Sequence, residues 1–233
     1  MLCKTQTKKR PLLNQRVVVT QRAELAAPLV AGLKKQGTHV LQVPVTQWTP
    51  PPNPTRFDKM LAKAKSYDWI LFSNQHAVHF FIKRYRELFG NVRGLAGVRL
   101  GAYGPMTGRA LRKSRLKPTS IATDHKTKLI LQSITKTGSV KGQRFLIIQG
   151  NPKRVTEKVP QALKKLGARV DVLQGYDVKV NTQDLTGDAD DLLKNGADWI
   201  LFSSALAIEH FDRRFNIKKL LKRFPNIRLA LHK

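Results

Sequence analysis

The sequence has little that could crosslink it or place it in a membrane. Its 233 residues include a single cysteine, Cys3, so an internal disulfide is excluded. No stretch approaches the roughly 20 uninterrupted apolar residues of a membrane span. The start of the chain carries charges with no apolar run after them, unlike a secretory signal. We therefore expect a cytoplasmic protein with no membrane partner.

Acidic residues are also scarce: 15 Asp and Glu stand against 43 Lys and Arg, for a formal net charge of +28. Such an excess often indicates a polyanionic partner. The lysines are spread over nearly every expected helix, however, and aromatic residues make up only 7% of the chain. Because a basic stripe and a stacking platform are both missing, nucleic acid is not the expected partner. A lysine-rich proteome would explain the charge equally well.

Motifs for metals, cofactors and hydrolysis are incomplete. The six histidines show no metal-ligand spacing, and His76 and His79 are expected on the surface of a helix. Ser203-Ser204 lacks the Gly-x-Ser-x-Gly elbow of a hydrolase. Gly101 and Gly104 do not complete a dinucleotide fingerprint, and there is no Walker loop. The histidines therefore predict no metal site, and the glycines predict no nucleotide site.

What the sequence does contain is an internal repeat. Residues 67–74 read Tyr-Asp-Trp-Ile-Leu-Phe-Ser-Asn, and residues 197–204 read Ala-Asp-Trp-Ile-Leu-Phe-Ser-Ser. Each apolar run is typical of a strand buried on both faces. Each is followed by a long amphipathic segment, 75–89 or 205–224, expected to be helical. A buried strand that leads into a helix is half of a parallel βαβ unit.

The repeat extends beyond these strands. Gln15-Arg16 with its apolar run matches Gln143-Arg144, and Val98-Arg99-Leu100 matches Ile227-Arg228-Leu229. Nothing after residue 229 matches the turn Gly104-Pro105-Met106-Thr107 and its helix. We therefore expect the last strand and helix of the second copy to be missing, and an extended chain to be more stable and more active.

The expected fold is α/β, with two similar three-layer lobes of parallel, flavodoxin-like sheets joined by a two-stranded β-ribbon hinge. Residues 1–14 are expected to be a disordered basic tail. One lobe is split between 15–37 and 181–233, and the other is the insertion 49–168, which begins in a proline-rich stretch. The linker strands are expected at 38–48 and 169–180. Such a hinge would leave a cleft between the lobes, a favoured place for a ligand.

These residues resemble the uroporphyrinogen-III synthase family over essentially the whole chain from Arg16. The resemblance rests on residues 17–20 with Arg22, and on the segments 68–74, 104–107, 163–167, Tyr176 and 198–204. Members of this family have two α/β lobes and a two-stranded linker. They cyclise linear hydroxymethylbilane to uroporphyrinogen III and invert the last pyrrole ring. The resemblance implies a lyase of tetrapyrrole and heme biosynthesis, without cofactor, acting on a small molecule with eight carboxylates. We expect a monomer.

The resemblance also implies which residues form the site. Tyr176 is the expected catalytic residue, because it could hydrogen-bond the departing hydroxyl or stabilise developing charge. Packing on the hinge is the alternative for this ring. The expected substrate-binding residues lie at strand ends and helix starts, where each hydroxyl could equally be a plain N-cap: Thr20, Arg22, Ser73, Asn74, Gly104, Thr107, Gly150, Arg154, Ser203 and Ser204.

The sequence departs from the family at several places. Gln21 separates Thr20 from Arg22, Ser73-Asn74 replaces the usual Thr-Ser, and the second Gly-Pro-x-Thr turn is missing. Two other functions stay open. One is a two-lobed hinge protein that binds a small polyanion without chemistry, for which the Tyr176 hydroxyl would be dispensable. The other is a basic nucleic-acid-associated protein, whose binding would weaken steeply with salt.

Overall fold

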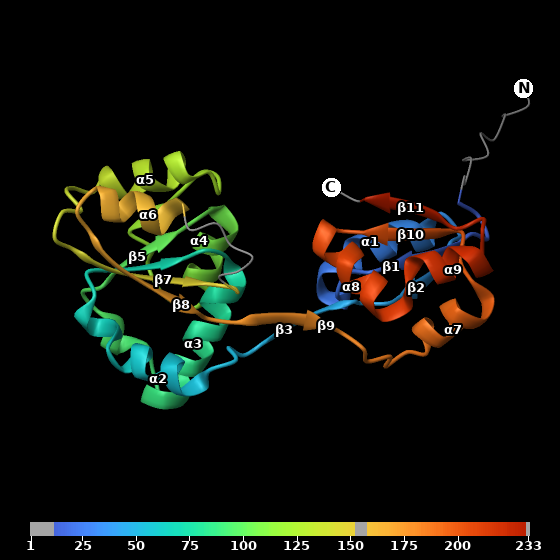
Figure 1. The fold of residues 1–233 in the computed structure, drawn as a ribbon, viewed down its shortest axis with the longest axis horizontal. Helices are drawn as coiled ribbons and strands as arrows, with labels where there is room; N and C mark the ends of the chain where they lie inside the picture. The colour runs from blue at the N-terminus through green and yellow to red at the C-terminus, as the bar shows by residue number, and fades with distance from the viewer. Residues whose placement is uncertain (1–11, 152–157, 232–233) are drawn as a thin grey trace, which may run out of the picture. The chain divides into compact units, whose positions relative to one another are not determined.

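The computed structural model describes residues 12–151 and 158–231. The chain divides into two compact units: unit 1 comprises Met1–Gln47 and Lys179–Lys233, and unit 2 comprises Trp48–Val178 (Figure 1). Each unit contains one parallel sheet with helices on its faces. The α/β class with two parallel sheets is as predicted.

Unit 2 contains a five-stranded sheet in which every described pairing is parallel. The strand order is β6-β5-β4-β7-β8, so the order reverses between β4 and β7. Counted along the unit this is 3-2-1-4-5, which differs from the 2-1-3-4-5 order of flavodoxin itself. The elements are α2 (Pro54–Ala62), β4 (Trp69–Phe72), α3 (Gln75–Phe89), β5 (Arg99–Ala102), α4 (Pro105–Lys113), β6 (Ser120–Ile121), α5 (Thr127–Thr135), β7 (Arg144–Gln149), α6 (Lys158–Lys165) and β8 (Arg169–Gln174), with short 3-10 turns at Ala64–Ser66 and Arg93–Leu95.

The two faces of this sheet are covered by different helices. Ile70 and Phe72 of β4 pack with α2, α3 and α4 in one apolar cluster. Trp69 and Leu71 of the same strand pack with α5 and α6 in another. Figure 1 shows α5 and α6 on one side of the sheet and α2 and α3 on the other. All four residues of β4 are buried, as predicted for a strand covered on both faces.

Unit 1 has a four-stranded parallel sheet in the order β11-β10-β1-β2. This order corresponds to β5-β4-β7-β8 of unit 2, so the sequence repeat is also a repeat of topology. Helix α1 packs on one face, and α7, α8 and α9 pack on the other. The elements are β1 (Arg16–Val19), α1 (Ala23–Lys35), β2 (His39–Gln42), α7 (Asp188–Asn195), β10 (Trp199–Phe202), α8 (Ala205–Phe215), α9 (Ile217–Arg223) and β11 (Arg228–Leu231).

The repeated Asp-Trp pair holds together the amino ends of the strands. In unit 2 the Asp68 carboxylate accepts the Arg144 N–H at 2.7 Å. The indole N–H of Trp69 donates to Gln143 at 3.0 Å, and the Arg99 guanidinium lies over the Trp69 ring, 4.9 Å from its centroid. These contacts tie β4 to its two neighbours, β7 and β5.

Unit 1 repeats each contact with its own copy of the residue. Asp198 accepts the Arg16 N–H at 2.7 Å, and Trp199 donates to Gln15 at 2.8 Å. The Arg228 guanidinium lies over the Trp199 ring at 5.2 Å. The most nearly identical part of the repeat therefore stabilises the amino edge of each sheet, opposite to the carboxyl edge where open α/β sheets bind ligands.

The two copies differ in how well their strands are covered. Trp199 and Leu201 of β10 are only half-buried, although their counterparts in β4 are completely buried. The cause is that α1 is the one described helix on this face of unit 1, whereas α5 and α6 share the equivalent face of unit 2.

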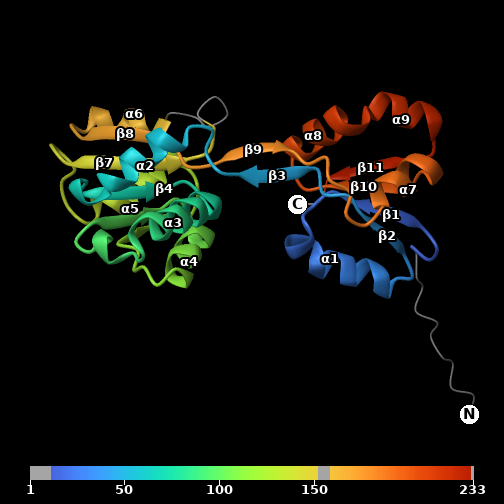
Figure 2. The same cartoon turned by 90° about the horizontal axis from the view of Figure 1, so that it is seen from below.

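The ribbon is shorter than the linker expected from the sequence. Within 38–48, β2 is an edge strand of unit 1, and only β3 (Thr46–Thr49) enters the two-stranded sheet. Within 169–180, β8 is an edge strand of unit 2, and β9 (Asp177–Val180) pairs with β3 (Figure 2). An edge strand of a sheet and a strand of a two-stranded ribbon each have one exposed side. Both therefore show the same alternation of apolar and polar residues, and the sequence does not distinguish them.

The amphipathic segment that follows β10 is two helices instead of one. Helix α8 ends and α9 begins at Asn216, which has a positive φ of 54°. Asparagine tolerates this left-handed conformation, and its side chain accepts the Lys219 N–H at 3.0 Å. The corresponding helix of unit 2, α3, is continuous, as expected.

Candidate active site

The carboxyl ends of the parallel strands of unit 2 meet along one edge of the sheet. Strand β4 ends just before Ser73, β7 ends just before Gly150, and Tyr176 follows β8. Six of the expected site residues lie on this edge or in the helix starts that leave it: Ser73, Asn74, Gly104, Thr107, Gly150 and Tyr176. The sequence predicts a site with residues from both lobes. These six residues all belong to unit 2 and lie at one edge of its sheet.

Tyr176 is held by contacts from two neighbouring connections. Its hydroxyl oxygen accepts a hydrogen bond from Nδ2 of Asn74 at 2.6 Å. A Cβ atom at Gly150 would lie only 2.9 Å from Cζ and Oη of Tyr176, so glycine allows the backbone to approach the ring. Burial raises the pKa of Tyr176 above its ordinary value, against the opposing effect of the Asn74 hydrogen bond. The hydroxyl is therefore protonated at neutral pH.

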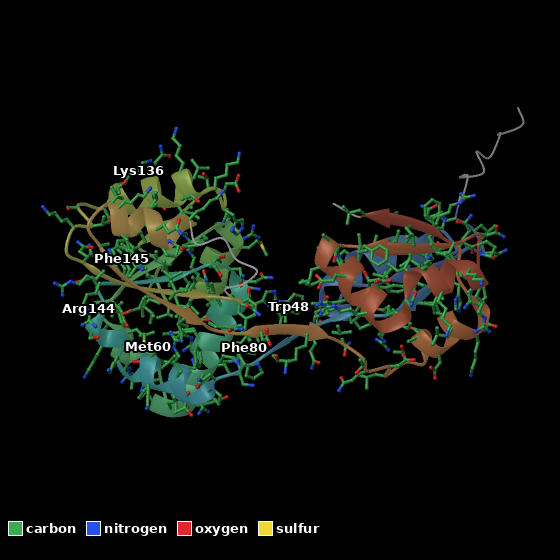
Figure 3. All side chains as sticks on the ribbon, viewed as in Figure 1. Trp48, Met60, Phe80, Lys136, Arg144 and Phe145 are labelled. Atoms are coloured by element: carbon green, nitrogen blue, oxygen red, sulfur yellow. The ribbon has the colours of Figure 1, made fainter. Side chains whose placement is uncertain are left out.

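Three further rings lie beside Tyr176 or next to its neighbours. Phe80 stacks on Tyr176 with ring centroids 6.1 Å apart, and His76 lies 6.0 Å from the same ring. His76 also stacks on Trp48 at 4.2 Å. Figure 3 labels Trp48 and Phe80 within unit 2. The phenol ring therefore has the apolar Phe80 ring on one side and the polar imidazole of His76 nearby.

His79 is exposed as expected, whereas His76 is less exposed than the surface position expected for it. The His76 ring is half-buried, because Asn74 caps the start of α3 and thereby fixes the first turn in which His76 lies. His76 and Phe80 are four residues apart and share one face of α3. That spacing, directly after a strand end, was the sequence signal for this group of rings.

Three buried polar atoms on the same edge have no hydrogen-bond partner within the described part of the chain. They are Oγ of Ser73, Oη of Tyr103 and Nε2 of Gln149. The strand register continues one residue beyond Phe72, Ala102 and Ile148, so the three residues are neighbours in the backbone of β5, β4 and β7. The Tyr103 ring packs in the apolar cluster under α5, and its complete burial raises the pKa of Tyr103 strongly. Unpaired buried polar groups are costly, and each of them indicates an ordered water or a ligand group.

The turn at the start of α4 was also expected at the site. Pro105 is the first residue of α4, and the helix has no side-chain N-cap in the described structure. Thr107 is buried in the first turn, and Gly104 lies beside the His125 ring, which a Cβ atom would approach to 3.1 Å. The N–H groups of this turn form a feature that favours an anion.

The expected residues of unit 1 lie at the carboxyl edge of its own sheet, and three of them have partners there. Thr20 donates from Oγ1 to the Leu201 carbonyl at 2.8 Å. Ser204 caps α8, because its Oγ accepts the Ala207 N–H at 3.2 Å. Their neighbours Arg22 and Ser203 follow the same strands, with Arg22 paired to Glu24 at 3.4 Å and Ser203 exposed. Arg154 lies outside the described residues.

Comparison with known proteins decides the family. A family model described as Uroporphyrinogen-III synthase HemD matches residues 27–228, most of the chain. The chain belongs to the uroporphyrinogen-III synthase family. The resemblance drawn from the residues is thereby confirmed.

Two solved structures of uroporphyrinogen-III synthases share the fold at low sequence identity. A mutant enzyme of Thermus thermophilus aligns with a TM-score of 0.57 and 21% identity, over 93% of this chain and 84% of that chain. The enzyme of Helicobacter pylori 26695 aligns with a TM-score of 0.56 and 14% identity, over 94% of this chain and 92% of that chain. The architecture of this chain is therefore the architecture of that family.

Sequence relatives carry related names. The porphyrin biosynthesis protein HemD of Ruminiclostridium josui is 25% identical over 105 residues, which are 45% of this chain and 21% of that protein. The chain thus spans about a fifth of that relative. A protein of Methanothermobacter thermautotrophicus, provisionally named as a uroporphyrinogen-III synthase, is 23% identical over 89% of this chain and 82% of its own length.

Clusters of metal ligands and membrane-spanning helices are both missing from the described residues. Among residues 12–151 and 158–231, no group of three or more His, Cys, Asp or Glu side chains could hold a metal ion. In the same ranges, every helix is too short or too polar to cross a membrane.

Proposed function

We propose that this chain is a uroporphyrinogen-III synthase, a hydro-lyase that cyclises hydroxymethylbilane with inversion of ring D. Family membership supports the reaction class. The observation that carries the proposal is the Tyr176 hydroxyl, buried at the carboxyl edge of unit 2 and hydrogen-bonded to Asn74. A protonated phenol in that position can assist the departure of a hydroxyl group.

In the proposed first step, Tyr176 donates to the terminal hydroxyl of the substrate. The C–O bond breaks, the oxygen leaves as water with the added proton, and an azafulvene cation remains. Attack by ring D on this cation gives the spiro intermediate, which fragments and closes again with ring D inverted. The final closure releases a proton from the α-carbon of ring D, and this proton restores the phenol. The overall change is the loss of one water molecule.

The other residues of the site bind the carboxylates of the substrate in this proposal. The uncapped first turn of α4 and the unpaired groups of Ser73 and Gln149 are the proposed donors in unit 2. Thr20, Arg22, Ser203 and Ser204 are the proposed contacts from unit 1. The formal charge of +28 would raise the encounter rate with a polyanion.

The test is a coupled assay with freshly made hydroxymethylbilane, in which the uroporphyrin isomers are separated after oxidation. The proposal predicts isomer III, formed faster than the spontaneous reaction forms isomer I. Formation of isomer I alone, at the spontaneous rate, would reject the proposal. A binding protein without chemistry would give that second result while still binding the substrate.

A further inference from the structure

Asn74 connects the start of α3 to the hydroxyl of Tyr176. Its Oδ1 accepts two backbone hydrogen bonds, from the N–H groups of His76 and Ala77, both at 3.0 Å. Its Nδ2 donates to Oη of Tyr176 at 2.6 Å. The side chain is thus an N-cap and a tyrosine ligand at once.

The cap settles the orientation of the Asn74 amide. The oxygen and nitrogen of an asparagine side chain are hard to distinguish by shape, so their assignment depends on the hydrogen-bond network. Here two backbone donors point at one end of the amide, and only oxygen can accept both. The nitrogen must therefore face Tyr176, and Asn74 must be the donor of that bond.

This direction decides where the Tyr176 proton points. A phenol oxygen can accept one bond and donate another. Because Oη accepts from Asn74, its own proton is directed away from Asn74. The ring itself is held in place by the Phe80 stack and by the close approach of Gly150. The remaining freedom is the rotation of the O–H bond, which the Asn74 bond restricts.

From this geometry we propose that Asn74 is a positioning residue that fixes Tyr176 as a hydrogen-bond donor toward the substrate. The inference rests on the proposed function, in which Tyr176 assists loss of the substrate hydroxyl. As the phenol gives up its proton, negative charge grows on Oη, and the Asn74 N–H stabilises that charge. The same amide thus orients the donor and supports the transfer.

Asn74→Asp tests the direction of the bond without removing the cap. Aspartate is as good an N-cap as asparagine, and a carboxylate is favourable at a helix start, so α3 should keep its stability. The carboxylate cannot donate to Oη, however, and would accept the phenol proton instead. We expect kcat for isomer III to fall about 10²-fold, with little change in KM. Asn74→Ser keeps a cap but is too short to hold Tyr176, so we expect a smaller loss.

Asn53→Asp is the matched control. Asn53 caps α2 by accepting the Arg56 N–H at 2.9 Å, in the same way that Asn74 caps α3. The control should retain the wild-type kcat, because Asn53 makes no described contact with Tyr176. A wild-type kcat in Asn74→Asp would overturn the proposal. So would a raised KM with unchanged kcat, which would make Asn74 a substrate ligand.

A second readout separates this inference from the proposed function. In protein labelled with 13C at tyrosine Cζ, the Tyr176 shift of Asn74→Asp should move toward the phenolate value at neutral pH, because the phenol now donates to a carboxylate. Asn53→Asp should leave that shift in place. An unchanged Tyr176 shift in Asn74→Asp contradicts the bond direction, whatever the activity. Failure of the wild-type protein to form isomer III would instead reject the proposed function.

Discussion

Tyr176 and Asn74 lie 102 positions apart in the chain, and the order of β4, β7 and β8 brings them together. The sequence identified both residues separately, from their places after strands and from the family resemblance. It could not predict that they touch, because contact depends on side-chain length and on which strands are neighbours. It also missed the group of His76, Phe80 and Trp48. The four-residue spacing of His76 and Phe80 places both on one face of α3, but nothing in the sequence connects them to Trp48 or to Tyr176.

Activity should not depend on Tyr176 ionisation near neutral pH. Burial raises the pKa of Tyr176 above its ordinary value of 10.0, so the hydroxyl stays protonated below that pH. We expect no fall in kcat from this group until the pH rises above about 10. The check is a pH profile of isomer III formation by the wild-type protein and by Tyr176→Phe. A basic limb near neutral pH that Tyr176→Phe abolishes would contradict the assignment.

Tyr103→Phe should stabilise the protein in the absence of substrate. The Tyr103 hydroxyl is buried with no partner in the described structure, and removing such a group relieves a desolvation cost of about 1–3 kcal/mol. Tyr67→Phe is the contrast, because the Tyr67 hydroxyl donates to Asp171 at 2.7 Å and its loss should cost about 1–2 kcal/mol. Thermal unfolding of both variants checks this. Equal destabilisation by the two substitutions would show that Tyr103 is satisfied.

At the scale of elements, the repeated Asp-Trp-Ile-Leu-Phe-Ser stretch predicted the central strand of each sheet correctly. Its apolar run indicates burial, and the Asp-Trp start is explained by the contacts to β7 and β5, or to β1 and β11. The apolar run does not show how completely the helices bury each strand. That burial depends on α1, α5 and α6, which lie outside the repeated stretch.

The two tryptophans of the repeat should differ in their contribution to stability. Trp69→Ala should cost about 3–5 kcal/mol, the usual cost of truncating a completely buried large side chain. Trp199→Ala should cost less, because Trp199 is half-buried while making the same hydrogen bond and cation contact. Amide exchange of peptides that cover β4 and β10 measures each unit separately. An equal loss of protection in both units would contradict the difference in cover.

At the scale of the whole molecule, the chain is two homologous α/β units with unequal chemistry. All four tyrosines, Tyr67, Tyr85, Tyr103 and Tyr176, lie within unit 2. Burial raises the pKa of each, for Tyr67 to about 12 with help from Asp171. The sequence repeat predicts the two-unit organisation. The sequence also shows that the tyrosines lie in one half of the repeat, but only the structure shows that all four are buried and therefore have raised pKa values.

Unit 2 should therefore lose stability selectively at alkaline pH. A folded-state pKa above the unfolded value stabilises the fold below about pH 10, and that stability is lost as the pH rises toward the folded values. Phenolate absorbance during an alkaline titration should rise late and together with amide exchange of unit 2. Phenolate formation at the ordinary tyrosine pKa, with unit 2 still protected, would contradict the burial of these rings.

The central claim is that Tyr176 takes part in the chemistry at the carboxyl edge of unit 2. Its most direct test is the kcat for isomer III formation by Tyr176→Phe, with Tyr85→Phe as a buried-tyrosine control on α3. The account predicts a fall of about 10²-fold for Tyr176→Phe and a wild-type kcat for Tyr85→Phe. Wild-type turnover to isomer III by Tyr176→Phe would contradict it and leave this ring with a packing role.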